Sequence, residues 1–223
     1  MEITKEQHTY EWYGSRLGNF TASQVSKLMG ATDIKKDTFG DTAMSYICQV
    51  SAERQIKQFK WNGMSDDEKE EFIRIQYPQT LPMKWGNEHE ASARALYCFT
   101  NNLDCNESGT HCNAERPHVT ASPDGFIGDD SLIEIKCPKI ETFAKYSYTI
   151  IDNETMKSEI PQYYWQVMLQ MYVTGRDKCH FVWYHPLLGV TGVVINRNDD
   201  DIKLLLSRID KAEEIVKSII DKI

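Results

Sequence analysis

Apolar residues at the end of the chain recur at helical spacing. From Asp199 onward they stand alternately three and four positions apart, at Ile202, Leu205, Ile209, Ala212, Val216, Ile219 and Ile223. This period predicts an amphipathic helix, and the three aspartates at its start suit the positive end of a helix dipole. Its apolar seam can pack on the protein's own core or contact a neighbouring subunit.

The middle of the chain has a different period. Residues 131–137 (Ser-Leu-Ile-Glu-Ile-Lys-Cys) alternate apolar and charged side chains, which predicts a half-buried strand that Pro138 ends. Further strands are predicted over residues 119–122, 178–185 and 190–196. The stretches Pro123-Asp-Gly125 and Gly128-Asp-Asp130 are typical of turns.

Residues that cap or end helices predict the remaining helical segments. They are expected over residues 21–30, 42–56, 87–100 and 159–173, with Gly175 closing the last one. An acidic helix should follow the capping box formed by Ser65 and Glu68. The order of the elements predicts an α/β (α+β) fold of one domain, residues 1–223, with a central mixed sheet between helices.

Composition narrows the class of protein. The chain has 223 residues, 41% of them hydrophobic, enough to bury a substantial core. No stretch approaches the roughly 20 apolar residues of a membrane span, and the N-terminus lacks the pattern of a signal peptide. We therefore expect a soluble, intracellular protein. The six cysteines are scattered without a Cys-x-x-Cys pair, which favours reduced thiols and no iron–sulfur cluster.

The net charge of −8 argues mildly against DNA binding, because phosphate contacts need Lys and Arg. Net charge does not say where the positive residues lie, however, and carboxylates that bind metal add to the negative count. A DNA-binding function therefore stays open.

The candidate chemistry lies around Asp124, Glu134 and Lys136. Glu134 and Lys136 are two positions apart on a predicted strand, so they share one face, while Ile133, Ile135 and Cys137 share the other. We expect Asp124, at the end of the preceding strand, to return beside Glu134 across a hairpin. Two converging carboxylates repel each other, and a hard divalent cation such as Mg²⁺ removes that repulsion, with the Ile135 carbonyl as a further ligand.

Such a cation can polarise a phosphodiester and lower the pKa of a bound water, and Lys136 can orient or deprotonate that water or neutralise the transition state. The alternative is a surface hairpin with an Asp-Gly turn and an ordinary Glu–Lys pair. The spacing alone leaves both interpretations open.

The Asp-x(n)-Glu-x-Lys pattern resembles the restriction-endonuclease-like (PD-(D/E)xK) nuclease superfamily. Further segments, in order along the chain, resemble the phage lambda exonuclease family, also known as the YqaJ-like viral recombinase family. These segments begin at Trp12 (WYGSRLG), Thr21 (TAS), Trp85 (WGNEHE), Ser122 (SPDG), Glu134 (EIKCP) and Trp165 (WQVMLQMY). The chain departs from the family pattern over residues 56–80, where we expect an insertion.

The resemblance implies a restriction-endonuclease-like core and a set of site residues. The implied catalytic residues are Asp124, Glu134, Lys136 and Gln166. The implied ligands of two Mg²⁺ ions, or of Mn²⁺ as a substitute, are Asp124, Glu134, the Ile135 carbonyl and, directly or through water, Glu90. The implied pocket for a DNA 5′-phosphate contains Arg16, Ser23 and Ser122, with Tyr163 as a weaker candidate.

Each of these residues has a simpler interpretation. Glu90 can form an i,i+4 salt bridge with Arg94 on a solvated helix face. Thr21 or Ser23 can cap a helix while Arg16 stays in solvent, although a helix N-terminus beside an Arg also suits an anion. Gln162 and Gln170 fit a solvated amide face.

The family resemblance predicts a Mg²⁺-dependent 5′-to-3′ exonuclease. It would act on double-stranded DNA ends, release 5′-mononucleotides and leave 3′ single strands for a single-strand annealing recombinase. The resemblance also implies a ring-shaped homotrimer. The rival hypotheses are a structure- or sequence-specific endonuclease on the same core and a catalytically dead DNA-binding module.

Overall fold

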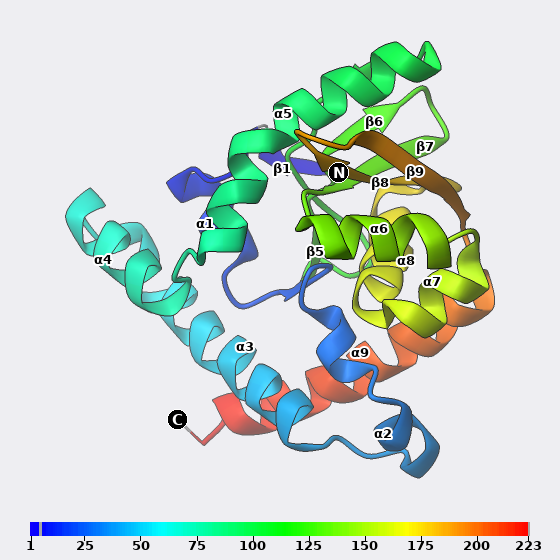
Figure 1. Cartoon of the computed structure of the whole chain (residues 1–223). Helices are drawn as coiled ribbons and strands as arrows, with labels where there is room; N and C mark the ends of the chain where they lie inside the picture. Colours follow the sequence, from blue (N-terminus) through cyan, green and yellow to red (C-terminus); the bar gives the residue numbers. More distant parts are fainter. Residues whose placement is uncertain (5, 223) are drawn as a thin grey trace.

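The chain forms two β-sheets in this computed structural model, which describes residues 1–4 and 6–222 (Figure 1). The larger sheet has the order β3-β6-β7-β8-β9 and is mixed: β7 and β8 run parallel, and the other neighbours are antiparallel. Its strands are β3 (Cys105–Asn106), β6 (Gly125–Ile127), β7 (Ser131–Lys136), β8 (Lys178–His185) and β9 (Gly189–Asn196). The smaller sheet has the order β1-β4-β5-β2, with β1 (Glu2–Thr4), β4 (Thr110–Cys112), β5 (Val119–Ala121) and β2 (Phe20–Thr21).

Strand β7 lies inside the larger sheet and separates two apolar clusters. Leu132 belongs to the main core, whereas Ile133 and Ile135 pack with Ala93 and Tyr97 of α5 (Leu81–Asn101). This is the period-two alternation predicted from the sequence. Glu134 and Lys136 therefore share a face with Leu132, opposite the apolar face that α5 covers.

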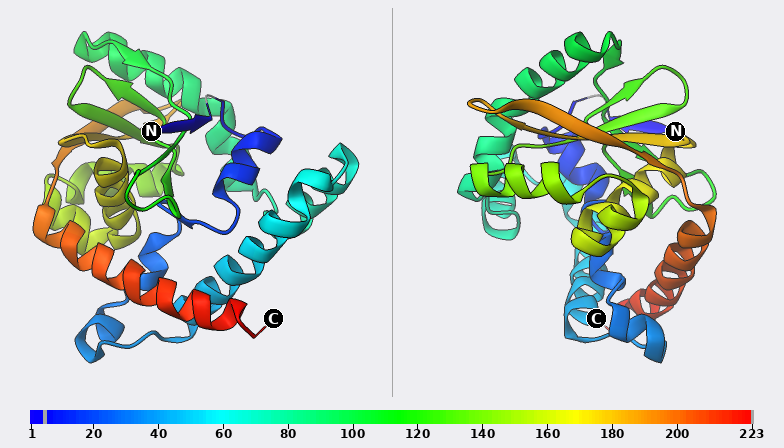
Figure 2. Two further views of the ribbon diagram at one scale, coloured as in Figure 1. Left: turned by 180° about the vertical axis from the view of Figure 1, so that it is seen from behind. Right: turned by 45° about the vertical axis from the view of Figure 1, so that its right-hand side comes forward.

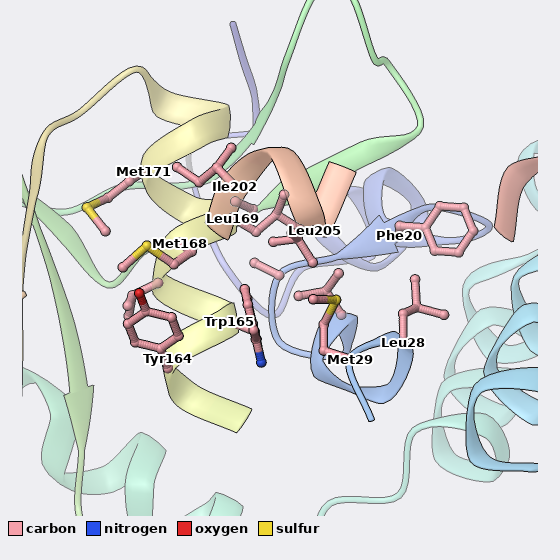
Figure 3. Packing of buried hydrophobic residues seen from close by; sticks show 14 of the residues in the cluster. Phe20, Leu28, Met29, Tyr164, Trp165, Met168, Leu169, Met171, Ile202 and Leu205 are labelled. Carbon is pink, nitrogen blue, oxygen red and sulfur yellow. The ribbon is translucent and has the colours of Figure 1, made fainter. Parts of the chain in front are cut away.

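The main core lies where α8 (Pro161–Thr174), α9 (Asp199–Ile220) and the turn η1 (Val25–Leu28) meet. Figure 3 shows Trp165 and Leu169 of α8 packed among Leu205, Leu28 and Met29. Helix α3 (Asp41–Phe59) lies beside α9 on the far side of this core (Figures 1 and 2). The predicted apolar seam of α9 is buried from Ile202 to Val216, so it packs on the protein's own core; Ile223 lies outside the described residues.

The remaining helical segments surround the sheets. They are α1 (Tyr10–Arg16), α2 (Ala31–Lys36), η2 (Trp61–Gly63), α4 (Asp66–Gln76), α6 (Ile140–Thr149) and α7 (Asn153–Glu159). The predicted capping box precedes α4, with Ser65 and Glu68 each accepting the other's backbone N–H. Helix α4 buries no residue and projects away from the sheets (Figures 1 and 2), within the segment 56–80 predicted as an insertion. No described helix is both long and apolar enough to span a bilayer.

The helix predicted over residues 21–30 is wrong. The backbone N–H groups of Phe20 and Ala22 donate to the carbonyls of His118 and Thr120, at 2.8 and 2.9 Å. This pairing places the start of the segment in a sheet beside β5. Only Val25–Leu28 is helical, as a short 3₁₀-helix, because tertiary pairing outweighs local propensity here.

Two predicted helix boundaries and one predicted hairpin also differ. Helix α5 begins earlier, at Leu81, because the Thr80 hydroxyl caps it by accepting the Met83 N–H. The helix predicted over residues 159–173 breaks at Ile160, which separates α7 from α8. The hairpin partner of β7 is β6, which follows Asp124; the strand before Asp124, β5, belongs to the smaller sheet.

Candidate active site

The predicted site residues line one cavity of about 720 Å³. They come from widely separated parts of the chain: Arg16, Ser23, Glu90, Ser122, Asp124, Glu134, Ile135, Lys136, Tyr163 and Gln166. The volume lies within the range of ligand and substrate pockets. The fold therefore places the carboxylates Asp124 and Glu134 in the same cavity as Arg16, Ser23 and Ser122.

Asp124 is held by the backbone of β7. Its N–H donates to the Ile133 carbonyl at 3.1 Å, and its carboxylate Oδ2 accepts the N–H of Ile135 at 2.6 Å. These two bonds place Asp124 level with Glu134, at the point where β6 and β7 begin to pair. The predicted convergence of the two carboxylates is thus produced by the β6–β7 hairpin instead of by a strand that ends at Asp124.

Glu134 is a nearly buried carboxylate, with a relative exposure of 2%. Gln166 donates Nε2 to its Oε1 and Gln170 donates Nε2 to its Oε2, each at 2.6 Å. Lys136 Nζ also contacts Oε1. A buried charge needs such partners, because unpaired it would lose its hydration without compensation.

Gln170 is the residue that the sequence analysis misassigned. Gln162 and Gln170 were both expected on a solvated face of the helix. Gln162 is exposed, but Gln170 is fully buried. A signal for this was present, because Gln170 follows Gln166 by four positions and therefore lies one turn further along the same face of α8.

Lys136 lies between the carboxylates and an aromatic ring. Its Nζ is 4.8 Å from the centroid of Tyr163, which places this ring in the site through a cation–π contact. Burial alone would lower the pKa of Lys136, but Glu134 and Asp124 outweigh it and raise the pKa. The amine is therefore protonated and suits stabilisation of negative charge better than proton abstraction.

Glu90 makes the predicted ion pair and is also part of the cavity wall. The ion pair is the i,i+4 contact with Arg94, at 3.2 Å. Arg94 in turn bridges to Glu107 at 2.6 Å. Burial, followed by the charge of Glu134, raises the pKa of Glu90.

The electrostatics of these carboxylates test whether a cation fits the site. Burial first, and then the charges of Glu134 and Glu90, raise the pKa of Asp124 well above its usual range. Within residues 1–4 and 6–222, no three His, Cys, Asp or Glu side chains form a ready metal cluster. The predicted ligands Asp124, Glu134 and Glu90 are hard oxygen donors that line one cavity, and such donors fit a divalent cation.

Arg16 forms a second charged group in the cavity. Its guanidinium donates to Ser23 Oγ at 2.8 Å and to Ser122 Oγ at 3.3 Å, and it stacks 4.4 Å from the Trp12 ring. Trp12 Nε1 donates to the same Ser122 hydroxyl at 3.2 Å. In the part of the chain that the structure describes, Arg16 makes no ion pair with a carboxylate. Burial lowers its pKa, so a bound anion would stabilise its charged form.

One expectation about this group is wrong. Arg16 is the last residue of α1, and Ser23 precedes only the four-residue turn η1, so no α-helix begins beside them. Free N–H groups of a helix N-terminus are therefore not part of the site. Arg16, Ser23 and Ser122 line the cavity together without such a helix end beside them.

Known proteins share this fold and sequence pattern. The model of the YqaJ-like viral recombinase domain matches residues 11–177. The structure of an alkaline exonuclease (LHK-Exo) from Laribacter hongkongensis is similar over 96% of this chain and 95% of its own, with 27% identity and a TM-score of 0.73. Its complex with dAMP is similar at 28% identity and a TM-score of 0.74, with the same coverage.

Two further relatives are more distant or shorter in overlap. A phage-related exonuclease from Haemophilus somnus shares the fold at 17% identity and a TM-score of 0.66, over 92% of this chain and 96% of its own. An uncharacterized protein of Acanthamoeba polyphaga mimivirus is 31% identical over 110 residues, which are 44% of this chain. The chain spans only 19% of the length of that mimivirus protein.

The fold defines the class of the protein, because 96% of the chain has the architecture of the alkaline exonuclease LHK-Exo. More particularly, the chain belongs to the YqaJ-like viral recombinase domain family. The predicted family and the predicted mixed α/β fold with helices around the sheet are both confirmed.

Proposed function

We propose that the protein is a Mg²⁺-dependent 5′-to-3′ exonuclease of double-stranded DNA. The observation that carries the proposal is the presence of two complementary groups in one cavity: the carboxylates with Lys136, and the Arg16–serine group. The first suits phosphodiester hydrolysis and the second suits a terminal phosphate. A site that binds a 5′-phosphate next to its hydrolytic centre selects DNA ends.

Asp124, Glu134 and the Ile135 carbonyl would hold the cation, with Glu90 bound directly or through water. When bound, Mg²⁺ (or Mn²⁺) would polarise the phosphodiester and lower the pKa of an attacking water. Protonated Lys136 would then stabilise negative charge that develops on the phosphate. Gln166 would keep Glu134 in place, and Arg16 with Ser23 and Ser122 would bind the 5′-phosphate.

The complex of LHK-Exo with dAMP supports this assignment, because dAMP is a mononucleotide, the product class expected here. From the same family relationship we propose a homotrimer that encircles DNA, and a single-strand annealing recombinase as the partner that receives the 3′ strand. A ring would also reconcile DNA binding with the net charge of −8 if Lys and Arg residues line its channel.

Cleavage is expected to require a DNA end. Linear DNA labelled at one 5′ end should release labelled mononucleotide in Mg²⁺, while covalently closed circular DNA of the same sequence stays intact. The measurement is product length over time on a denaturing gel, with EDTA as the metal-free control. Cleavage of the closed circle would favour the endonuclease hypothesis. Retained binding without cleavage of either substrate would favour a DNA-binding module.

Removal of the cation is expected to destabilise the protein at alkaline pH. Without a cation, the free energy of unfolding should fall as the pH rises from about 4 through the raised pKa of Asp124, because the folded state binds more protons than the unfolded state in that window. Mg²⁺ at a hundredfold excess over its Kd should restore about 2.7 kcal/mol. For a chain of this size that is roughly 5–10 °C in Tm.

Scanning calorimetry with EDTA and with Mg²⁺, over a pH series, measures this effect. Asp124→Asn is the matched variant: it should lose the pH-dependent destabilisation and most of the stabilisation by Mg²⁺. Equal Tm values with and without Mg²⁺ across the pH series would contradict a cation site at these carboxylates.

A further inference from the structure

Glu134 is held by two amides, and one of them lies outside the site described above. Gln166 donates to Oε1 and lines the cavity, whereas Gln170 donates to Oε2 from one turn further along α8. Gln170 has a relative exposure of 0% and is not among the residues that line the cavity. It can therefore act on a substrate only through Glu134.

The amide oxygen of Gln170, Oε1, indicates that this side chain is not there to stabilise the core. Gln170 Oε1 is buried and has no hydrogen-bond partner among the described residues. Such an orphan acceptor is unfavourable, and an apolar side chain of similar size would fill the same space without it. The amide cannot flip to relieve this, because flipping would turn Oε1 toward a carboxylate oxygen. Stability of the core does not explain Gln170, whereas a Glu134 carboxylate that accepts a donor on each oxygen does.

We propose that Gln170 is a positioning residue for the hydrolytic site. Gln166 and Gln170 hold opposite oxygens of one carboxylate at 2.6 Å, so they fix its rotation. Glu134 then presents a preorganised oxygen to a cation without reordering at each turnover. The inference rests on the proposed function, because it assigns Glu134 as a ligand of the cation.

The test replaces Gln170 by methionine, which has similar length and no donor. Gln170→Met is expected to lower kcat on linear DNA by about 10- to 100-fold, the usual effect of losing a partner of a metal ligand. The Mg²⁺ concentration for half-maximal activity should rise, while KM for DNA and Tm stay near the wild-type values. Gln162→Met, on the exposed part of the same helix, is the matched control and should change none of these quantities.

Gln170→Glu distinguishes loss of the Nε2 donor from a change in side-chain shape. It keeps the side-chain size but sets a second carboxylate against Glu134, so its kcat should fall at least as far as that of Gln170→Met. Wild-type kcat and Mg²⁺ dependence in Gln170→Met would overturn the inference. Failure of Gln170→Met to fold, or a fall in activity matched by a fall in Tm and DNA binding, would also overturn it, since the amide would then serve stability.

The wild-type protein in the same assay distinguishes failure of the proposed function from failure of the role of Gln170. Absence of Mg²⁺-dependent cleavage by the wild type counts against the proposed function itself. Cleavage by the wild type together with undiminished cleavage by Gln170→Met counts against the role of Gln170 alone.

Discussion

Replacing Lys136 with alanine is expected to abolish cleavage, with a fall in kcat of roughly 10²- to 10⁴-fold. Lys136 contacts Glu134 and lies 4.8 Å from the Tyr163 ring, so its ammonium group is fixed inside the cavity. Its raised pKa keeps it charged, which makes it the positive group best placed to stabilise charge on a phosphate. Single-turnover rates on linear DNA, with DNA affinity measured by fluorescence anisotropy, test this expectation.

The matched control is Lys139→Ala, which removes an exposed lysine three positions further along the chain. Lys139 does not line the cavity, so its loss should leave the rate unchanged. The Tm of Lys136→Ala shows whether the loss reflects unfolding, because the change leaves the buried charge of Glu134 with amide partners only. Near-normal turnover by Lys136→Ala would remove Lys136 from the mechanism.

Replacing Arg16 with alanine is expected to erase the preference for 5′-phosphorylated DNA ends over 5′-hydroxyl ends. The guanidinium is held by two neutral hydroxyls and pairs with no carboxylate in the described chain, so its charge is available to a phosphate. Charge-assisted hydrogen bonds contribute about 1.5–3 kcal/mol, which corresponds to a loss of selectivity of roughly 10- to 150-fold. The ratio of kcat/KM for the two kinds of end measures it.

Arg16→Lys refines this test, because lysine keeps the charge and loses the planar fork that contacts both serines. It should give an intermediate ratio. Arg74→Ala on α4 is the control, since Arg74 is exposed and pairs only weakly with Glu71, at 3.9 Å. An unchanged ratio in Arg16→Ala would refute the phosphate pocket.

The features that the sequence predicts well depend on residues close together in the chain. Glu134 and Lys136 share a face because side chains on a strand alternate, and a strand keeps this alternation in any fold. The capping box at Ser65 and the apolar seam of α9 are likewise set by neighbours within one turn of helix. These predictions needed no information about which elements meet in space.

The errors arose where distant segments compete for the same backbone or side chain. Phe20 and Thr21 form a strand because the carbonyls of His118 and Thr120 accept the N–H groups of Phe20 and Ala22. Gln170 is buried because Glu134, 36 positions away, requires a second donor. In both cases local propensity was weaker than a partner that the chain order does not reveal.

Patterns within the chain are enough to predict the alternation of β7, the capped helices and the acidic and basic residues that can do chemistry. The order of the motifs also indicates the membership of the family. It takes the folded chain to show that Arg16 and its two serines line the same cavity as Asp124 and Glu134. The physical reason is that hydrogen-bond pairing and burial between remote segments fix these distances, whereas residue type and spacing fix only what each segment can offer.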